Sequence, residues 1–264
     1  MQIHYINLER RKDRNERFLA MNSPVAEFRR IDAIDGGYVD RDELAREGVI
    51  RSPLTMYSPG ALGNALSHRK MWQLAAASDA PLTVAEDDAV LNRRFVSKAQ
   101  RVLGVLPSDW DIIFWGWNFD AQFCVQIIEG IKNATMRFDS SKLGPRVSEF
   151  QDKDYEVAPL RVITAFGVVC YSVSPKGGQR LLEECFPLTD EMIRVVGLRW
   201  ALRRSTIDAV MSQHSGALRS YVAFPPLAWT ENDWNVSDVY PRASWQARLE
   251  WLFSRTLGRW FGMF

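Results

Sequence analysis

The sequence is poor in the features that mark several classes of protein. Its 264 residues include only three cysteines, Cys124, Cys170 and Cys185, and these have no CxxC or Cys/His spacing. Neither a disulfide framework nor a zinc site is therefore expected. No apolar run reaches 18 residues, and the N-terminus lacks the apolar core of a signal peptide. These absences favour a protein of the reducing cytosol.

The chain also lacks an excess of charge of either sign. It carries 33 basic and 32 acidic residues, a net charge of +1, which argues against nucleic-acid binding driven by phosphate neutralisation. A hydrophobic content of 47% and a charged content of 25% are ordinary values for globular proteins. The composition therefore predicts a folded chain with one main domain and no global electrostatic partner.

Apolar and amphipathic segments alternate along the chain, which is typical of an α/β protein with a mainly parallel sheet flanked by helices. The polar stretch 130–157 interrupts this pattern and indicates a long excursion or a small subdomain. The expected strands cover 2–8, 25–31, 81–85, 111–115 and 162–173, and the expected helices cover 9–21, 61–78, 89–105 and 175–186.

Three consecutive carboxylates, Glu86, Asp87 and Asp88, follow the apolar strand 81–85 directly. Open α/β sheets bind ligands at the carboxyl ends of their strands. If the segment stays extended, Glu86 and Asp88 share one side and Asp87 faces the other. Two carboxylates on one side can hold a hard cation such as Mn²⁺ or Mg²⁺, which could bridge nucleotide phosphates. The alternative is a solvated acidic turn.

Other side chains have both a functional and a structural interpretation. The basic start of the first helix, with Arg11 and Arg14, could attract a phosphate. His68 follows Ser67 on the helix before the acidic strand and is either a buried hydrogen-bonding residue or a contact of the donor site. Trp117 or Phe119 could stack on a sugar, or could simply belong to the core.

The order of these motifs resembles glycosyltransferase family 25, the lipopolysaccharide and collagen glycosyltransferase family. Two positions depart from the family pattern: Ala61 stands where an acidic residue is usual, and Asn64 where a cysteine is usual. The matching segments are 6–8 with Arg11 and Arg14, 31–36, 60–72 and 86–88, followed by the weaker matches 167–177, 207–208, 225–227 and 236–237.

The resemblance implies a GT-A-like fold in a single catalytic domain over 1–240. Residues 1–115 would form the nucleotide-sugar-binding half and 116–240 the acceptor half. The cation would be held by Glu86 and Asp88, with a UDP-sugar as donor. The expected donor contacts are Asn7, Arg11 and Arg14 to the nucleotide or diphosphate, Asp32 and Asp35 at the base, Asp87 near the ribose or sugar, and Ser67 and His68 nearby.

Members of the family resemble inverting transferases, which need a carboxylate as general base for the acceptor hydroxyl. Asp208 is the expected base, with Asp190 and Glu191 as competitors and a role at a helix start as the structural alternative. The resemblance suggests transfer of galactose from UDP-galactose to a lipopolysaccharide, lipooligosaccharide or related glycan. Two alternatives stay open: a two-carboxylate glycoside hydrolase, and a non-catalytic nucleotide-sugar-binding or membrane-associated scaffold.

The C-terminal segment 244–264 has an aromatic and aliphatic stripe opposite Arg248, Arg255 and Arg259. Such a basic amphipathic helix binds anionic membrane surfaces, or it docks on its own domain. A second basic stretch contains Arg194, Arg199, Arg203 and Arg204, and is either a solvated face or a contact for a phosphorylated, membrane-borne acceptor. The expected location is cytoplasmic, with possible peripheral contact at the inner face of the cytoplasmic membrane.

Overall fold

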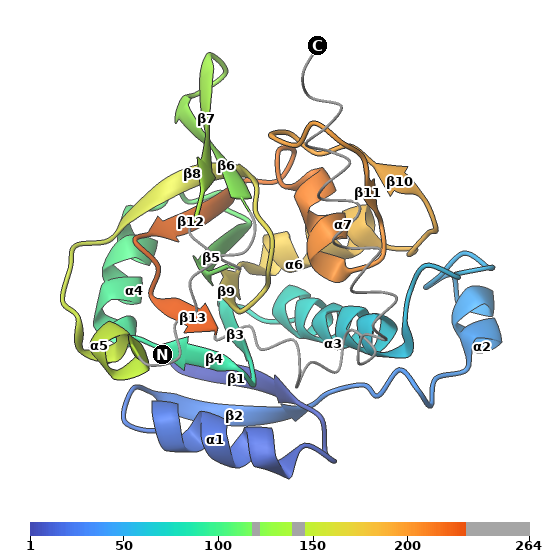
Figure 1. Ribbon diagram of the computed structural model, residues 1–264, viewed down its shortest axis with the longest axis horizontal. Helices are drawn as coiled ribbons and strands as arrows, with labels where there is room; N and C mark the ends of the chain where they lie inside the picture. Colours follow the sequence, from blue (N-terminus) through green and yellow to red (C-terminus); the bar gives the residue numbers. More distant parts are fainter. Residues whose placement is uncertain (118–121, 139–145, 231–264) are drawn as a thin grey trace.

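A computed structural model of the protein describes residues 1–117, 122–138 and 146–230 (Figure 1). Within them, nine strands form one central sheet in the order β2-β1-β3-β9-β5-β12-β8-β6-β7. The strands are β1 (Gln2–Asn7), β2 (Glu27–Asp32), β3 (Leu82–Glu86), β5 (Ile112–Gly116), β6 (Gln122–Ile128), β7 (Lys132–Arg137), β8 (Ala158–Thr164), β9 (Cys170–Val173) and β12 (Ser220–Phe224). Only β9, β8 and β7 run against the other six. The predicted α/β class with a mainly parallel sheet is confirmed.

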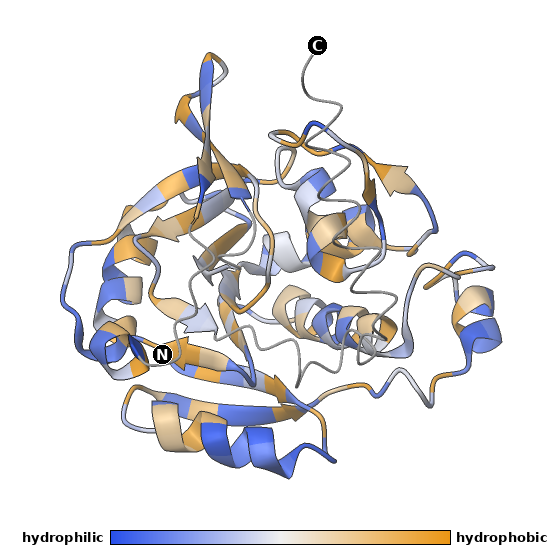
Figure 2. Ribbon diagram, viewed as in Figure 1, coloured by the Kyte–Doolittle hydropathy of each residue, from blue (hydrophilic) through white to orange (hydrophobic). Residues whose placement is uncertain are grey.

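Helices cover both faces of the sheet because its central strands are apolar on both sides. Ile112 and Phe114 of β5 face a core shared with α3, α6 and α7, whereas Ile113 and Trp115 face a second core shared with α1 and α4. Figure 2 shows these central strands as largely hydrophobic. The helices are α1 (Lys12–Asn22), α2 (Arg41–Arg46), α3 (Pro59–Ala76), α4 (Phe95–Val105), α5 (Val147–Asp152), α6 (Pro175–Cys185) and α7 (Ile207–His214).

The predicted helix 89–105 is wrong at its start. Ala89–Leu91 forms strand β4, which pairs with β13 (Ala228–Thr230), and helix α4 begins only at Phe95. The buried amide of Asn22 accepts from the Leu91 backbone N–H at 2.9 Å and donates to the Ala89 carbonyl at 2.8 Å. These long-range hydrogen bonds satisfy backbone N–H and C=O groups of the extended segment. A helical pattern in the local sequence does not reveal them.

The predicted strand 162–173 is two strands. The loop 165–169 separates β8 from β9, and Gly167 within it has a φ of 88°, a conformation that favours glycine. Strand β9 then enters the sheet between β3 and β5. The predicted excursion at 130–157 contains β7 and α5, and β6 and β7 form a projecting hairpin (Figure 1).

The start of α3 packs backbone against backbone on the loop that follows β2. Ser58 caps the helix by accepting from the Ala61 N–H at 3.0 Å, and Pro59 occupies its first turn. A Cβ at Gly36 would collide with the Pro59 carbonyl, and one at Gly63 would collide with the Ile34 carbonyl. This contact fixes α3, which carries Asn64 and His68, against the end of β2.

No helix in the described part of the chain is long and apolar enough to cross a membrane. The predicted amphipathic helix 244–264 and the possible sugar contact Phe119 lie outside the described residues, as does the 236–237 motif.

Candidate active site

Three neighbouring parallel strands end at the same edge of the sheet and bring polar residues together there. Asn7 ends β1, Asp32 ends β2 and Glu86 ends β3. In the sheet register Asn7 lies beside Asp32, and Ile6 lies beside Glu86. This is the edge at which open α/β sheets bind ligands.

Asn7 and Arg14 connect β1 and α1 to the acidic cluster. The buried Asn7 amide donates to Asp87 Oδ2 at 2.7 Å and to the Arg11 carbonyl at 3.1 Å. Its Oδ1 accepts from Arg30 Nε at 3.0 Å. The Arg14 guanidinium forms an ion pair with Asp87 and lies 3.3 Å from Asp88 Oδ2. Arg14 therefore partly neutralises two of the three carboxylates.

Glu86 is held from the other side by helix α3. Its Oε1 accepts from Asn64 Nδ2 at 2.9 Å and lies 3.4 Å from His68 Nε2. His68 Nδ1 lies 3.0 Å from the Tyr171 hydroxyl, which also accepts from the Trp72 indole N–H at 3.1 Å. These hydrogen bonds are all satisfied when His68 Nε2 donates to Glu86 and the Tyr171 hydroxyl donates to Nδ1.

The contact between Asn64 and Glu86 is not predicted from the sequence, where Asn64 stands out only as a departure from the family pattern. Its position one helical turn before His68 could have revealed it, because residues four apart on a helix lie on one face. The alternation expected for Glu86 and Asp88 is also wrong. Strand β3 ends at Glu86 and the next two residues form a turn, so Asp87 and Asp88 share Arg14 while Glu86 faces α3.

The clustered carboxylates shift one another's protonation. Although 41% of the Asp88 side chain is exposed, the protein around its carboxylate displaces enough water to raise the pKa of Asp88 to about 6; attraction to Arg14 opposes this shift, and repulsion from Glu86 and Asp87 adds to it. Burial likewise raises the pKa of Asp87 despite Arg14 and Asn7. At Glu86 the burial effect is outweighed by His68, Asn64 and Arg14, so its pKa lies below the usual value. Asp87 and Asp88 thus have raised pKa values, whereas Glu86 loses its proton more readily than an ordinary glutamate.

We expect Asp88→Asn to raise the melting temperature of the metal-free protein at pH 7. Because the folded-state pKa of Asp88 is raised, its ionisation costs stability as pH rises through about 4 to 6. The neutral amide avoids that cost, so the advantage of the variant should vanish near pH 4, where the folded wild-type protein keeps this carboxyl protonated. Thermal melts across this pH range test this, with Asp79→Asn in an exposed turn as the control. A wild-type protein that is more stable at pH 7 would contradict it.

The predicted base Asp208 lies in the first turn of α7. Its Oδ2 accepts from the Gly167 N–H at 3.1 Å, and its Oδ1 accepts from the Ala209 N–H at 2.9 Å. Two residues beyond Gly167, the Val169 carbonyl accepts from the Glu86 N–H at 2.9 Å. The loop 165–169 therefore connects Asp208 to the end of β3 that carries the acidic cluster.

The two competitors of Asp208 serve local structure. Asp190 accepts hydrogen bonds from the Thr55 N–H and hydroxyl and from the Met56 N–H. Although burial raises its pKa, these bonds outweigh that effect and the pKa is lowered, which makes Asp190 a poorer base. Glu191 accepts from the Thr189 hydroxyl and lies 3.6 Å from the buried Arg204 guanidinium.

Three other predicted donor contacts, Arg11, Asp32 and Asp35, each form an ion pair with a nearby side chain. Arg11 pairs with Asp13 at 2.9 Å, and Asp35 pairs with Arg10 at 2.9 Å. Asp32 at the end of β2 is exposed and pairs with Arg30 at 2.7 Å. Asp32 and Asp35 thus remain accessible at the sheet edge.

The predicted donor contact Ser67 and the possible sugar contact Trp117 are buried. Ser67 accepts from the Ile34 N–H at 2.8 Å and donates to the Gly63 carbonyl at 2.7 Å, so it holds the loop after β2. The sugar-stacking role considered for Trp117 does not fit, because its ring is 1% exposed and packs on Phe123, Phe138 and Phe224.

Among the described residues, no group of three or more His, Cys, Asp or Glu side chains is arranged to hold a metal ion. Glu86 and Asp88 still fit a cation of the kind that uses one or two carboxylates and takes its other ligands from substrate phosphates and water. The Asp88 side chain is 41% exposed and therefore accessible to a cation, which would also neutralise the repulsion that Asp88 experiences from Glu86 and Asp87. The donor set is all oxygen, as Mg²⁺ and Mn²⁺ prefer.

The sequence profile of glycosyltransferase family 25, described as an LPS biosynthesis protein family, matches residues 1–193. The chain belongs to this glycosyltransferase family, and the family predicted from the motifs is confirmed.

The curated relatives include procollagen galactosyltransferase 2 of Homo sapiens and of Mus musculus, each 24% identical over 196 residues that cover 69% of this chain. The match spans 27% of each relative's length. A crystal structure of mannose-1-phosphate geranyltransferase from Thermus thermophilus covers 84% of this chain and 72% of its own, at 12% identity and a TM-score of 0.33, which is too low to bear on the fold.

Proposed function

We propose that the protein is a metal-dependent inverting glycosyltransferase that moves galactose from UDP-galactose to a lipopolysaccharide, lipooligosaccharide or related glycan. The observation that carries this proposal is the cluster of Glu86, Asp87 and Asp88 at the carboxyl edge of the sheet, beside Asn7 and Arg14. Galactose rests on the names of the curated relatives, and the glycan on the family description. The proposed site of action is the cytoplasmic face of the membrane.

In the proposed donor site, Glu86 and Asp88 hold Mn²⁺ or Mg²⁺ and Asp87 lies near the ribose or the sugar. The cation would neutralise charge that develops on the departing diphosphate. Asn64 and His68 fix the Glu86 carboxylate, and Asn7 fixes Asp87. Arg14, which contacts Asp87 and Asp88, would bind the diphosphate, while Arg11, the exposed Asp32 and the partly exposed Asp35 would border the nucleotide.

In the proposed transfer, Asp208 takes the proton of the acceptor hydroxyl as that oxygen attacks the anomeric carbon. The bond to the nucleoside diphosphate breaks on the opposite face of the sugar, so the configuration inverts. Two features support Asp208 over Asp190: its loop connects to the Glu86 end of β3, and Asp190 is occupied by three hydrogen bonds. The Gly167 and Ala209 N–H groups would hold the Asp208 carboxylate in position.

Isothermal titration of UDP and of several UDP-sugars tests the donor assignment. We expect UDP to bind when Mn²⁺ is present and binding to weaken strongly when the metal is chelated. The Asp88→Ala variant should lose the metal-dependent part of UDP binding, because one of the two carboxylate ligands of the metal is removed. Asp79→Ala, which removes an exposed carboxylate elsewhere, is the matched control. Absence of UDP binding with and without metal would refute the proposed donor.

A non-catalytic nucleotide-sugar-binding protein is the second candidate, because both Asp208 oxygens accept backbone hydrogen bonds. Metal-dependent UDP binding combined with no turnover on credible glycan acceptors would favour it over the transferase.

A further inference from the structure

Exposed apolar side chains are concentrated at one end of the molecule. Of the nine large hydrophobic residues that are exposed in the described part of the chain, six lie in two segments. Three surround the β6–β7 turn, namely Ile127, Ile128 and Ile131, which are 57%, 53% and 80% exposed. The other three, Met192, Val196 and Trp200, lie in and between β10 (Met192–Ile193) and β11 (Leu202–Arg203). We call these two segments the apolar hairpins.

The apolar hairpins adjoin each other. The Gln122 side chain, at the start of β6, donates to the Gly197 carbonyl. A Cβ at Gly197 would lie 3.3 Å from both Cys124 and Thr135. Both segments rise from the same end of the molecule in Figure 1, where β6 and β7 project beyond the rest of the fold. The two apolar hairpins therefore adjoin each other at the base of the projecting hairpin, and their six exposed apolar side chains lie at the same end of the molecule.

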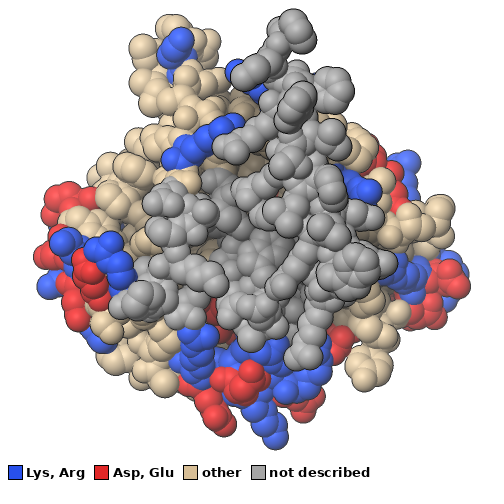
Figure 3. Space-filling view, in the orientation of Figure 1, with Lys and Arg blue, Asp and Glu red and all other residues tan. Residues whose placement is uncertain are grey.

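This surface is rich in basic side chains. Arg194, Arg199 and Arg203 are exposed, and none of them forms an ion pair with a described carboxylate. Within 122–138 and 191–204, Glu129 and Glu191 are the only acidic residues, and Glu191 pairs with Arg204. In the view of Figure 3 the projecting hairpin is tan and blue, without red.

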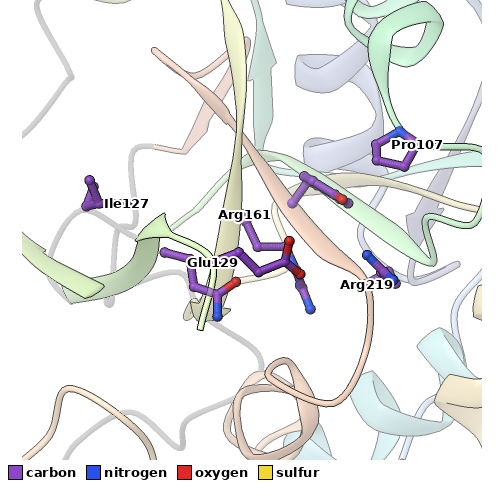
Figure 4. A pocket seen from close by; sticks show the side chains of 7 residues that line it. Pro107, Ile127, Glu129, Arg161 and Arg219 are labelled. Atoms are coloured by element: carbon purple, nitrogen blue, oxygen red, sulfur yellow. The ribbon is translucent and has the colours of Figure 1, made fainter. Parts of the chain in front are cut away.

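A pocket of about 270 Å³ adjoins the Ile127 side of the projecting hairpin. Arg161, Arg219, Tyr221 and Glu129 line it, together with Pro107, Gln126 and Ile127 (Figure 4). Arg219 pairs with the half-exposed Asp109 at 3.1 Å. The guanidinium groups of Arg161 and Arg219 therefore line the same pocket as Ile127 of the projecting hairpin.

The positive charge of the Arg161 guanidinium is not neutralised by an ion pair within the described residues. Its terminal nitrogens donate only to backbone carbonyls, those of Ser220 at 2.8 Å, Leu218 at 2.6 Å, Val162 at 3.2 Å and Gly216 at 3.5 Å. Its buried Nε has no hydrogen-bond partner among the described residues. Burial and repulsion from Arg219 outweigh the attraction of Tyr221 and Glu129 and lower its pKa. A phosphate in the pocket would relieve the repulsion between the Arg161 and Arg219 guanidinium groups.

We propose that the apolar hairpins dock on an anionic phospholipid surface, with the isoleucines entering the headgroup region and Arg161 and Arg219 binding a lipid phosphate. Apolar side chains flanked by unpaired arginines match the chemistry of such a surface, which combines an apolar interior with negative headgroups. A second copy of this chain is a poorer match, because pairing two such surfaces would bring Arg194, Arg199 and Arg203 of both copies together.

This inference rests on the proposed function in one respect. Both apolar hairpins belong to the predicted acceptor half, so docking on a membrane would bring that half to a membrane-borne glycan acceptor. Phe123 at the base of the projecting hairpin packs on Trp117, directly after β5, with ring centroids 5.0 Å apart. The two proposals fail separately, because UDP titration in solution does not depend on lipid and vesicle binding does not depend on UDP.

Co-sedimentation of the full chain with vesicles tests the docking surface. We expect binding to equimolar phosphatidylcholine and phosphatidylglycerol, weakened by salt, and little binding to phosphatidylcholine alone. Ile128→Ser/Ile131→Ser should lower the partition coefficient about tenfold or more, since apolar burial is lost. Arg219→Gln should lower the partition coefficient on anionic vesicles about fivefold, because one arginine near the membrane surface is lost.

Tyr38→Ser, which removes the most exposed aromatic side chain on the α2 side, is the matched control and should bind as wild type does. Circular dichroism melts establish that each variant is folded. Binding that is unchanged in the isoleucine variant would overturn the proposal and assign any membrane contact to another part of the chain. Failure of the wild-type protein to bind anionic vesicles, with or without self-association in sedimentation equilibrium, would overturn it as well.

Discussion

Asp208→Asn is expected to lower kcat by about 100-fold or more while leaving the affinity for UDP near the wild-type value. The asparagine Oδ1 can still accept one of the two backbone N–H groups that Asp208 binds, those of Gly167 and Ala209. The amide cannot take a proton from the acceptor hydroxyl. The change therefore separates the proposed role as base from the role in holding the loop 165–169.

Single-turnover and steady-state rates with a UDP-sugar and a glycan acceptor measure the effect, and UDP titration and thermal melts accompany them. Asp190→Asn is the control, since Asp190 binds Thr55 and Met56 and should affect stability more than turnover. Near-normal turnover in a folded Asp208→Asn enzyme would remove Asp208 as the base. A large loss of turnover in Asp190→Asn at unchanged stability would transfer the role to Asp190.

Arg14→Ala is expected to destabilise the protein at pH 7 by about 3 kcal/mol, because it leaves a cluster of partly buried carboxylates without their cation. Arg14 pairs with Asp87 and approaches Asp88, and all three carboxylates of the cluster raise its pKa against the opposing effect of burial. Because Arg14 lowers the pKa of Glu86, Asp87 and Asp88, its removal should raise the folded-state pKa of each of these acids. The deficit should therefore shrink as pH falls from 7 toward 4 and the acids take up protons.

Urea unfolding at pH 7 and at pH 4.5 to 5 (about one unit above the usual aspartate pKa) measures this pH dependence. Mn²⁺ should raise the melting temperature of Arg14→Ala more than that of the wild-type protein, since the cation replaces the missing charge. Arg101→Ala, which removes a solvent-exposed pair with Glu156, should cost little at either pH. A deficit that is equal at both pH values would show that Arg14 acts through packing and not through its charge.

The sequence predicts the parts of this fold that local patterns determine. The expected strands 2–8 and 111–115 and the helix 175–186 lie within a residue or so of β1, β5 and α6, because a strand buried on both faces and an amphipathic helix both have a clear periodicity. Long-range pairing accounts for the failures. Ala89–Leu91 is extended because Asn22 and β13 bind its backbone, and β6 and β7 pair with each other in a stretch that contains little apolar periodicity.

The candidate site likewise has features that could be predicted from the sequence and others that depend on long-range packing. The carboxylates and Asn7 could be found from their position after apolar strands, because parallel strands bring their carboxyl ends together. The partner of each carboxylate could not be found, because it depends on where β3 ends and how α3 lies. Asn64 binds Glu86 only because α3 presents one helical turn to the end of β3. Ser67, expected near the donor, instead binds Ile34 and Gly63.

The backbone contact between Gly36 and the first turn of α3 also bears on how the family's sequences can diverge. Each glycine fills space that the other's segment occupies, since a Cβ on Gly63 would strike Ile34 and the Gly36 backbone, and one on Gly36 would strike Pro59 and Gly63. A single replacement at either position would push α3, and with it Asn64 and His68, away from Glu86. Sequences that diverge from this one should therefore keep both Gly36 and Gly63, or change the two positions together with the length of the segment between them.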